Sequence, residues 1–533
     1  MTLPDPLQVA HRHVQAGELA EATALLESLL ATQPNHAEAL EGIGYIAAKQ
    51  GDAEKAARFI TRAIDAMPNP GTEQLHFAAH LCQHANHHAQ AVGHFERLLA
   101  KSPAHAESLL GIALSLVRLG DHDRALEHFD RLIRFHPRLA EPHYNKGNLL
   151  GMLGRYDDEI AAYRQAIALK PQFVAAHVNL GVALRDLHRF DDALQQFKKA
   201  VQIDTNDPGA RTNRAQTNLL LGQFEHGWRE YEWRWRDGTV ELGFDPATQW
   251  NGTQAVAGKT VLVHHEQGLG DTLQFVRFID RLRDAGAQVV LRVQDALLPL
   301  LRDYPAATRV IGEHEPVPSF DYHCPTLSLA FALKARDADL AMPKPYLHVD
   351  AARRAQWNDV FAAFDAVPDR ASKRPRVGIV WSGSTGHLND RNRSIPLATL
   401  APIFDADADF VSLQKDVRDD DRATLDRLVA QRKLVDVSAR LAGFDDTAAL
   451  IDGLDLVISV DTSVAHLSGA LGKPVWIALP FTPDWRWQLG RSDSPWYPTA
   501  RLFRQTARND WSNVIEDMRC ALQTQRASSD APR

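Results

Sequence analysis

One turn of the chain combines two glycines with a carboxylate. The stretch HHEQGLGDTLQF, His264 to Phe275, follows the apolar run KTVLV and leads into VRFIDRLRDAG, which is the order strand, turn, helix. Gly268 and Gly270 let the backbone approach a ligand closely, and Asp271 stands at the helix entrance. An aspartate there can cap the helix, or it can act as a general base that deprotonates an acceptor hydroxyl. Both interpretations stay open.

The same turn does not fit a dinucleotide. Leu273 stands where the fingerprint needs its third glycine, and the following run QVVLRVQ ends in Gln294 instead of an acidic residue. The NAD-binding pattern requires both features. The sequence therefore favours another phosphate-containing ligand or none.

A second turn, VDTSVAH, follows the apolar run LDLVIS. It places Asp461, Thr462 and Ser463 at the carboxyl end of a predicted strand, with His466 one turn into the next helix. A helix N-terminus offers free N–H groups and partial positive charge, which suit a diphosphate, and Asp461 can accept hydrogen bonds from sugar hydroxyls. Helix capping alone explains Thr462 or Ser463 but explains Asp461 and His466 together less well.

A third loop, in VWSGSTGHLNDRNRSIPL, joins small residues to arginines. Ser382, Gly383 and Ser384 follow a predicted strand, and Arg391 and Arg393 come next. Arginine suits phosphate oxygens, although surface loops with two arginines are common. Because ligands of open α/β sheets bind at the carboxyl ends of strands, we favour a binding loop.

These turns must be positioned by sheets. Short β-branched runs alternate with helical stretches after about residue 237: KTVLVH, QVVLRV, RVGIVW, FVSLQ, LVDVS, LDLVISV and KPVWIAL. Such runs are typical of parallel strands buried on both faces. The segment 340–375 interrupts the alternation, so we predict two Rossmann-like α/β lobes, 237–372 and 373–533, separated by a cleft.

The first half of the chain repeats itself. Prolines recur at Pro34, Pro68, Pro103, Pro137 and Pro171, with spacings of 34 or 35 residues. Each unit divides into two amphipathic helices around a glycine. This pattern resembles the tetratricopeptide repeat and predicts an all-α solenoid of six to seven repeats over residues 1–236. A solenoid of this kind has a concave groove that holds peptide or protein.

The last unit decays into GQFEHGWREYEWRW. Its aromatic side chains Trp228, Tyr231, Trp233 and Trp235 can bind a ligand or pack against the next domain, and burial statistics favour packing. Earlier departures include Glu159 at a position that is small in the other repeats.

Two stretches imitate metal sites. His84, His87 and His88 in HANHH have no carboxylate or cysteine to complete a ligand set, so we interpret them as a solvated helix end. The stretch DADAD, Asp405 to Asp409, precedes a predicted strand where a metal-binding DxD follows one, and we interpret it as a turn. We expect no metal.

Composition limits the class of protein. The 533 residues are 45% apolar and 24% charged, with a net charge of −8, as in globular proteins. The absence of a basic run argues against nucleic acid and anionic membranes as partners. Cys82, Cys324 and Cys520 are too few for a disulfide framework. No signal peptide or apolar span is recognisable, so we expect a cytoplasmic location.

With these motifs in view, residues from about 250 to 525 resemble the ADP-heptose lipopolysaccharide heptosyltransferases, which are GT-B enzymes that commonly need no metal. The family has a GD turn after its first strand and a DT…H turn before its last. The resemblance implies that Asp271 is the catalytic base and that Asp461, Thr462 and His466 bind the nucleotide sugar.

The resemblance also assigns further residues. In the family, a basic residue after the loop of small residues contacts phosphate, and Arg391 or Arg393 occupies that position here. Gln414 and Lys415, in FVSLQKD, occupy the strand end that contacts the nucleoside in the family. The ending DWRWQLGRSDSPWYP looks like that of bacterial fusions of tetratricopeptide repeats with such a transferase. Its Trp485, Arg486, Trp487 and Trp496 can border the cleft or pack the final segment, and we favour packing. The family has no repeat array and typically a lysine in the loop, so the donor's identity does not carry over.

These features favour a glycosyltransferase that moves a sugar from a nucleotide-sugar donor to a hydroxyl of a protein held in the groove, such as flagellin or another surface protein. A lipopolysaccharide or other glycan acceptor is the alternative. A non-catalytic scaffold with a degenerate transferase lobe is the third possibility, and the intact motifs disfavour it.

Overall fold

The chain folds into two compact units. The structure is a computed structural model that describes residues 5–236, 243–342, 344–365, 374–387 and 389–529. One unit comprises Met1–Leu184 and Gln202–Asp204, and the other comprises Arg185–Val201 and Thr205–Arg533. Each unit has hydrophobic clusters of its own. No helix in the described ranges is long and apolar enough to cross a lipid bilayer.

Paired helices form the repeats. Within the described residues before 232 they make seven consecutive pairs, in keeping with the six to seven repeats predicted: α1 Pro6–Ala16, α2 Leu19–Thr32, α3 Ala37–Lys49, α4 Ala53–Ala66, α5 Thr72–His84, α6 His88–Lys101, α7 Ala106–Leu119, α8 His122–Phe135, α9 Glu141–Met152, α10 Tyr156–Leu169, α11 Val174–Asp186, α12 Phe190–Ile203, α13 Pro208–Leu220 and α14 Phe224–Tyr231.

The turn inside each repeat needs a left-handed residue. Gly51 and Gly120 adopt φ near +80° there, as helix-ending glycines do. His188 occupies the same position with φ +58° although it is not a glycine. Its ring stacks on Phe481 with centroids 4.0 Å apart, and its Nε2 lies 3.0 Å from the Phe481 carbonyl oxygen. A contact with the loop after β8 (Val475–Leu479) therefore holds this strained residue.

The departure at Glu159 has a local compensation. Ala22, Ala56, Ala125 and Ala193, the small residues of other repeats, are fully buried between paired helices. Where Glu159 replaces the alanine, the partner helix carries Gly151, and a Cβ there would lie 2.5 Å from Glu159 Oε1. The larger side chain is accommodated because its neighbour has none.

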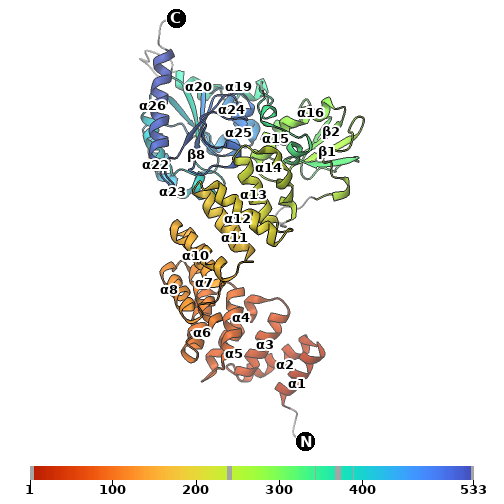
Figure 1. Cartoon of the computed structure of the whole chain (residues 1–533), viewed down its shortest axis with the longest axis vertical. Helices are drawn as coiled ribbons and strands as arrows, with labels where there is room; N and C mark the ends of the chain where they lie inside the picture. Colours follow the sequence, from red (N-terminus) through yellow and green to blue (C-terminus); the bar gives the residue numbers. More distant parts are fainter. Residues whose placement is uncertain (1–4, 237–242, 343, 366–373, 388, 530–533) are drawn as a thin grey trace. The chain divides into compact units, whose positions relative to one another are not determined.

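Two parallel sheets follow the helices (Figure 1). The first has the order β3-β2-β1-β4 and the second β6-β5-β7-β8-β9, and every pairing is parallel. The strands are β1 Thr260–His264, β2 Gln288–Arg292, β3 Arg309–Ile311, β4 Tyr322–Pro325, β5 Arg376–Val380, β6 Asp409–Ser412, β7 Leu456–Val460, β8 Val475–Leu479 and β9 Ala500–Arg504. The predicted fold class, a helical solenoid followed by parallel α/β regions, is confirmed.

Helices connect the strands of both sheets. Those described are α15 Leu269–Phe275, α16 Ile279–Asp284, α17 Leu298–Leu301, α18 Ser328–Ala332, α19 Ala351–Ala355, α20 Asn358–Asp365, α21 Asp390–Arg393, α22 Leu397–Leu400, α23 Asp419–Ala430, α24 Phe444–Asp452, α25 Ser463–Ala470 and α26 Ser512–Ser529. Short 3₁₀ turns interrupt them, including η1 Glu232–Arg236, η3 Val276–Phe278, η6 Ser438–Arg440 and η7 Trp485–Trp487.

Some predicted boundaries differ or lie outside the described residues. The run LVDVS, predicted as a strand, forms only one bridge, from Val435 to Val411, before η6 begins. The domain boundaries predicted at 236/237 and 372/373 border or fall within segments 237–242 and 366–373, which the structure does not describe.

The last repeat packs into the α/β core. Trp228 of α14 meets Trp485 edge to face, with centroids 5.3 Å apart, and also contacts Phe275. Its indole N–H donates to the Ala335 carbonyl over 3.2 Å. Tyr231 contacts Trp485 as well. Trp228 and Tyr231 are buried, as the interpretation of junction packing requires, whereas Trp233 and Trp235 are only half-buried.

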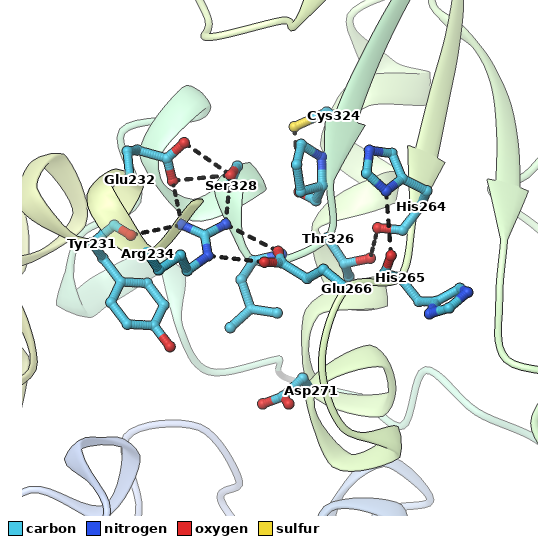
Figure 2. A network of polar contacts seen from close by, with 12 residues as sticks. Tyr231, Glu232, Arg234, His264, His265, Glu266, Asp271, Cys324, Thr326 and Ser328 are labelled. Carbon is cyan, nitrogen blue, oxygen red and sulfur yellow. Dashed lines mark hydrogen bonds and ion pairs between the residues drawn. The ribbon is translucent and has the colours of Figure 1, made fainter. Parts of the chain in front are cut away.

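A buried arginine also ties the last repeat to the first sheet (Figure 2). Arg234 donates to both carboxylate oxygens of Glu266, over 2.8 and 3.0 Å, to Glu232 over 2.8 Å and to Ser328 over 2.7 Å. The side chains of Arg234 and Glu266 are only 3% and 1% exposed. Because Glu266 lies two residues after the end of β1, this network anchors the strand end that leads to Asp271.

We predict that Arg234→Ala lowers the free energy of unfolding of the second unit by about 3–5 kcal/mol, because it leaves the buried Glu266 carboxylate without its cation. All eleven tryptophans lie between Trp228 and Trp511, so tryptophan fluorescence during urea unfolding reports on this unit. The control is Arg189→Ala, which breaks the exposed pair with Asp192 and should cost less than about 1 kcal/mol. Equal losses in both variants would contradict the role of the network.

Candidate active site

Asp271 uses its two oxygens differently. Gly268 is the N-cap of α15, and its N–H donates to Asp271 Oδ2 over 2.8 Å. The other oxygen, Oδ1, accepts from the Arg486 guanidinium. The aspartate is therefore a helix cap, as the structural alternative predicted, while its second oxygen faces charged groups. Its side chain remains 18% exposed, so it is not sealed inside its own lobe.

The two predicted turns meet directly. Helices α15 and α25 lie side by side (Figure 1). A Cβ placed on Gly270 would lie 2.9 Å from His466 Cδ2 and 3.4 Å from Ser463 Cα. The close approach that Gly270 allows is thus to α25, whose N-terminus adjoins Asp461. One turn from each sheet contributes to a single site.

Arg486 completes the contact between the lobes. Its Nη1 donates to Asp484 over 2.8 Å, its Nε donates to Gln274 over 2.8 Å, and its Nη2 reaches Asp271. The side chain is 8% exposed, and its guanidinium lies 4.1 Å from the Trp485 ring centroid. Sequence reasoning treated Arg486 as packing, together with the tryptophans around it. The available signal was an arginine between two tryptophans, because a guanidinium among aromatic side chains is buried and needs polar partners.

Burial changes the acidity of both carboxylates. Burial raises the pKa of the Asp271 carboxyl, Arg486 opposes that rise and Asp484 adds to it. Burial also raises the pKa of Asp461 to about 6, again with a contribution from Asp484, while Arg393 opposes it. These two groups therefore hold protons more tightly than exposed aspartates do.

The structure separates the two candidate arginines. Arg393 is largely buried, and its Nη1 donates to the Asp461 backbone carbonyl over 2.9 Å. Arg391 is exposed. Of the two, Arg393 is the one that the fold brings to the carboxyl end of β7.

The loop of small residues, Ser382 to Ser384, contacts Gln414 and Arg393. Gln414 accepts the Ser382 N–H over 3.1 Å, so the predicted nucleoside residue Gln414 supports the loop. A Cβ on Gly383 would lie 2.5 Å from Arg393 Nη2, so a larger residue there would displace the guanidinium from this position. Ser382 Oγ is buried without a partner among the described residues, and Ser384 is exposed. The loop thus offers one unused hydroxyl next to a cation.

The remaining predicted residues make contacts within the fold. Thr462 is the N-cap of α25, but its hydroxyl lies 3.0 Å from Ser459 Oγ and makes no cap bond. His466 Nδ1 lies 3.0 Å from the Tyr497 hydroxyl, its ring is stacked near Trp487, and burial holds its pKa well below the usual value. Ser463 is the first residue of α25.

Lys415 lies on the surface. It is exposed, and its Nζ donates to the Ala442 carbonyl over 3.0 Å. His387, which was not predicted as a site residue, acts to lower the pKa of the Asp271 carboxyl. Direct contacts join Arg486 to Asp271 and Asp484, and Arg393 to the Asp461 carbonyl.

The DADAD stretch lies elsewhere. Asp405 ends a 3₁₀ turn and pairs with Lys433 over 2.6 Å, while Asp409 begins β6 and is buried. The first four residues of the stretch precede the strand as predicted, but Asp409 belongs to β6 and is not part of a solvated turn.

Two family models match the chain. The tetratricopeptide repeat matches residues 7–69, 83–140 and 144–209, and glycosyltransferase family 9 (heptosyltransferase) matches residues 325–483. The chain therefore contains tetratricopeptide repeats and a glycosyltransferase family 9 domain. The second match includes Arg393 and Asp461, whereas Asp271 precedes it.

Individual proteins are also similar. Protein FlbA of Caulobacter vibrioides is 27% identical over 340 residues, which are 59% of this chain and 55% of that protein. This chain thus spans just over half the length of that relative. The crystal structure of MamA is 23% identical, with a TM-score of 0.29, and covers 31% of this chain and 95% of its own. A tetratricopeptide repeat protein from Parabacteroides merdae is 17% identical, with a TM-score of 0.34. The match covers 45% of this chain and 93% of that protein's chain.

We predict that Asp461→Asn stabilises the second unit at pH 7.5 by about 1–3 kcal/mol. A carboxyl whose folded pKa is raised to about 6 binds its proton more tightly when folded, so its ionisation costs stability as the pH rises through 6. The gain should shrink as the pH falls from 6 to 4. Urea unfolding, monitored by tryptophan fluorescence at each pH, measures this gain in the free energy of unfolding.

The control for that substitution is Asp303→Asn, which changes an exposed aspartate of the same unit and should leave stability unchanged. A pH-independent effect of Asp461→Asn would show that ionisation is not its cause.

Proposed function

We propose that the protein transfers a sugar from a nucleotide-sugar donor to a hydroxyl of a protein acceptor held by the repeats, in the cytoplasm and without a metal ion. The supporting observation is that the α15 turn with Asp271 and the α25 turn with Asp461 adjoin, with Arg393 and Arg486 beside them. A general base next to arginines and a helix N-terminus suits the transfer of a sugar away from a diphosphate leaving group.

In this mechanism Asp271 is the general base. Its Oδ1 takes the proton of the acceptor hydroxyl as that oxygen bonds to the anomeric carbon of the sugar. The bond from that carbon to the diphosphate oxygen breaks, and the nucleoside diphosphate leaves. Arg486 orients the carboxylate through its ion pair and keeps it ionised, while burial makes it more basic than an exposed aspartate.

The donor is assigned to the second lobe. The backbone N–H groups at the start of α25, around Thr462 and Ser463, and the Arg393 guanidinium offer donors to the diphosphate. Asp461 accepts hydrogen bonds from the donor's hydroxyls, and the Ser382 hydroxyl supplies one further contact. The other proposed donor-binding positions are Gly268, Gly270, Gly383, Ser384, Arg391, Gln414, Lys415 and His466.

A glycan acceptor is the second candidate. The matching family is described as heptosyltransferase, which favours a lipopolysaccharide or related glycan as the acceptor. In that case the repeats would dock the enzyme to other proteins and would not hold its substrate.

We predict that Asp271→Asn lowers kcat about 10²–10⁴-fold, because asparagine can still cap α15 but cannot accept the proton. The donor is first identified by thermal shift with a panel of nucleotide sugars, and transfer of labelled sugar to proteins of a gene-deletion lysate is then measured. Donor binding should be unchanged. Transfer at the wild-type rate would refute the assignment, and Asp303→Asn is the matched control.

We predict that removing residues 1–170 abolishes transfer to protein but preserves donor binding. The cut precedes α11 because Trp228 and Tyr231 of α14 belong to the core of the α/β half, so a cut at 236 would expose that core. A loss of at least about tenfold in transfer to protein, with the donor-induced thermal shift retained, supports a repeat-held acceptor. Undiminished transfer to isolated glycan favours the second candidate.

A further inference from the structure

Three side chains of types that can bind a metal ion lie close together within the repeats. They are far along the sequence from the proposed transferase motifs. His76 and His80 are four residues apart on α5, and Glu107 lies in the first turn of α7. His76 Nε2 lies 3.0 Å from His80 Nε2 and 2.6 Å from Glu107 Oε2. All three donor atoms lie within 4.8 Å of one another.

Hydrogen bonds among these groups leave the cluster incompletely satisfied. A neutral imidazole carries one N–H, so the single hydrogen on His76 Nε2 would have to be shared between a carboxylate oxygen and a second imidazole nitrogen. If the His80 nitrogen carries the hydrogen instead, His76 accepts it and has nothing to donate to Glu107. A cation at the common centre would satisfy all three lone pairs together.

Packing holds the two imidazoles in place. The His80 ring meets Phe95 edge to face at 5.5 Å, and the His76 ring meets His105 in the same way at 5.6 Å. The spacing of α5 and α7 is also set, because Gln83 Nε2 donates to the Gly111 carbonyl over 3.0 Å. The ligand atoms are therefore presented by two rigid helices and not by loops.

The donor set has a definite chemistry. Two histidines at i and i+4 with one carboxylate form a three-ligand set that zinc accepts, with a fourth position left for water or another donor. The site can be reached from solvent, since the Glu107 side chain is 68% exposed and that of His76 is 30% exposed. Hard cations such as Mg²⁺ prefer oxygen ligands and should not compete.

We propose that His76, His80 and Glu107 bind one Zn²⁺ ion that bridges two consecutive repeats and keeps an open coordination position towards solvent. This site is distinct from the histidines of the HANHH stretch. His87 of that stretch pairs only with Glu54 in the described structure, over 3.0 Å. The proposal is independent of the transferase activity.

The first test is calorimetric titration of the full chain with ZnCl₂ after chelator treatment. We expect one high-affinity equivalent of Zn²⁺ and none of Mg²⁺. His76→Gln, His80→Gln and Glu107→Gln should each weaken binding at least about tenfold, since even loss of groups that only support a ligand costs about 10–100-fold. His87→Gln, which breaks a two-residue His–Glu pair, should not.

A second readout locates the ion. Zinc bound between repeats should raise the melting temperature of the first unit by mass action. Far-UV circular dichroism should therefore show a zinc-dependent shift that tryptophan fluorescence, which reports on the second unit, does not follow. Glu107 is exposed, so Glu107→Gln should fold normally and lose this shift.

Three outcomes would overturn the proposal. The first is that the wild-type chain binds no Zn²⁺. The second is that the three substitutions leave the affinity for Zn²⁺ unchanged, and the third is that His87→Gln weakens Zn²⁺ binding as much as those three substitutions do. In the last two cases the ion lies elsewhere on the chain.

Discussion

The close approach of α15 to α25 is the contact on which the site depends. It exists because residue 270 has no side chain, so the first turn of one helix can lie against His466 and Ser463 of the other. Each helix N-terminus directs unpaired N–H groups and partial positive charge towards the end of its own strand. Asp271 and Asp461 lie at these two helix ends, where burial raises the pKa of both carboxyls.

Buried arginines fix the strand end that carries Asp271. Arg234, which follows the last repeat helix, holds Glu266, and Arg486, from the second lobe, holds Asp271. Each of these two buried guanidinium groups is neutralised by carboxylates, and removing either partner of such a pair is costly. The turn between β1 and α15 is thus held from both sides, by the last repeat and by the opposite sheet. The last repeats are accordingly part of the same compact unit as the sheets.

Local patterns predicted much of the fold. The 34-residue period identified the repeats even at His188, where the glycine is missing but the left-handed conformation is kept. Apolar runs located most strands correctly because both faces of a parallel sheet are buried. The run LVDVS misled because it has the composition of a strand, yet beside β6 it makes only one bridge. Composition reports burial, whereas pairing depends on the neighbouring strand.

The sequence by itself determined the repeat array, the parallel α/β architecture and the turns that carry Asp271 and Asp461, because periodicity, turn residues and capping are local properties. Only the tertiary structure decided that Arg393 and not Arg391 reaches Asp461, that Arg486 pairs with Asp271, and that His76, His80 and Glu107 converge. Those contacts join residues from different helices, lobes or repeats. Their distances depend on how the helices and sheets pack, which no short stretch of sequence encodes.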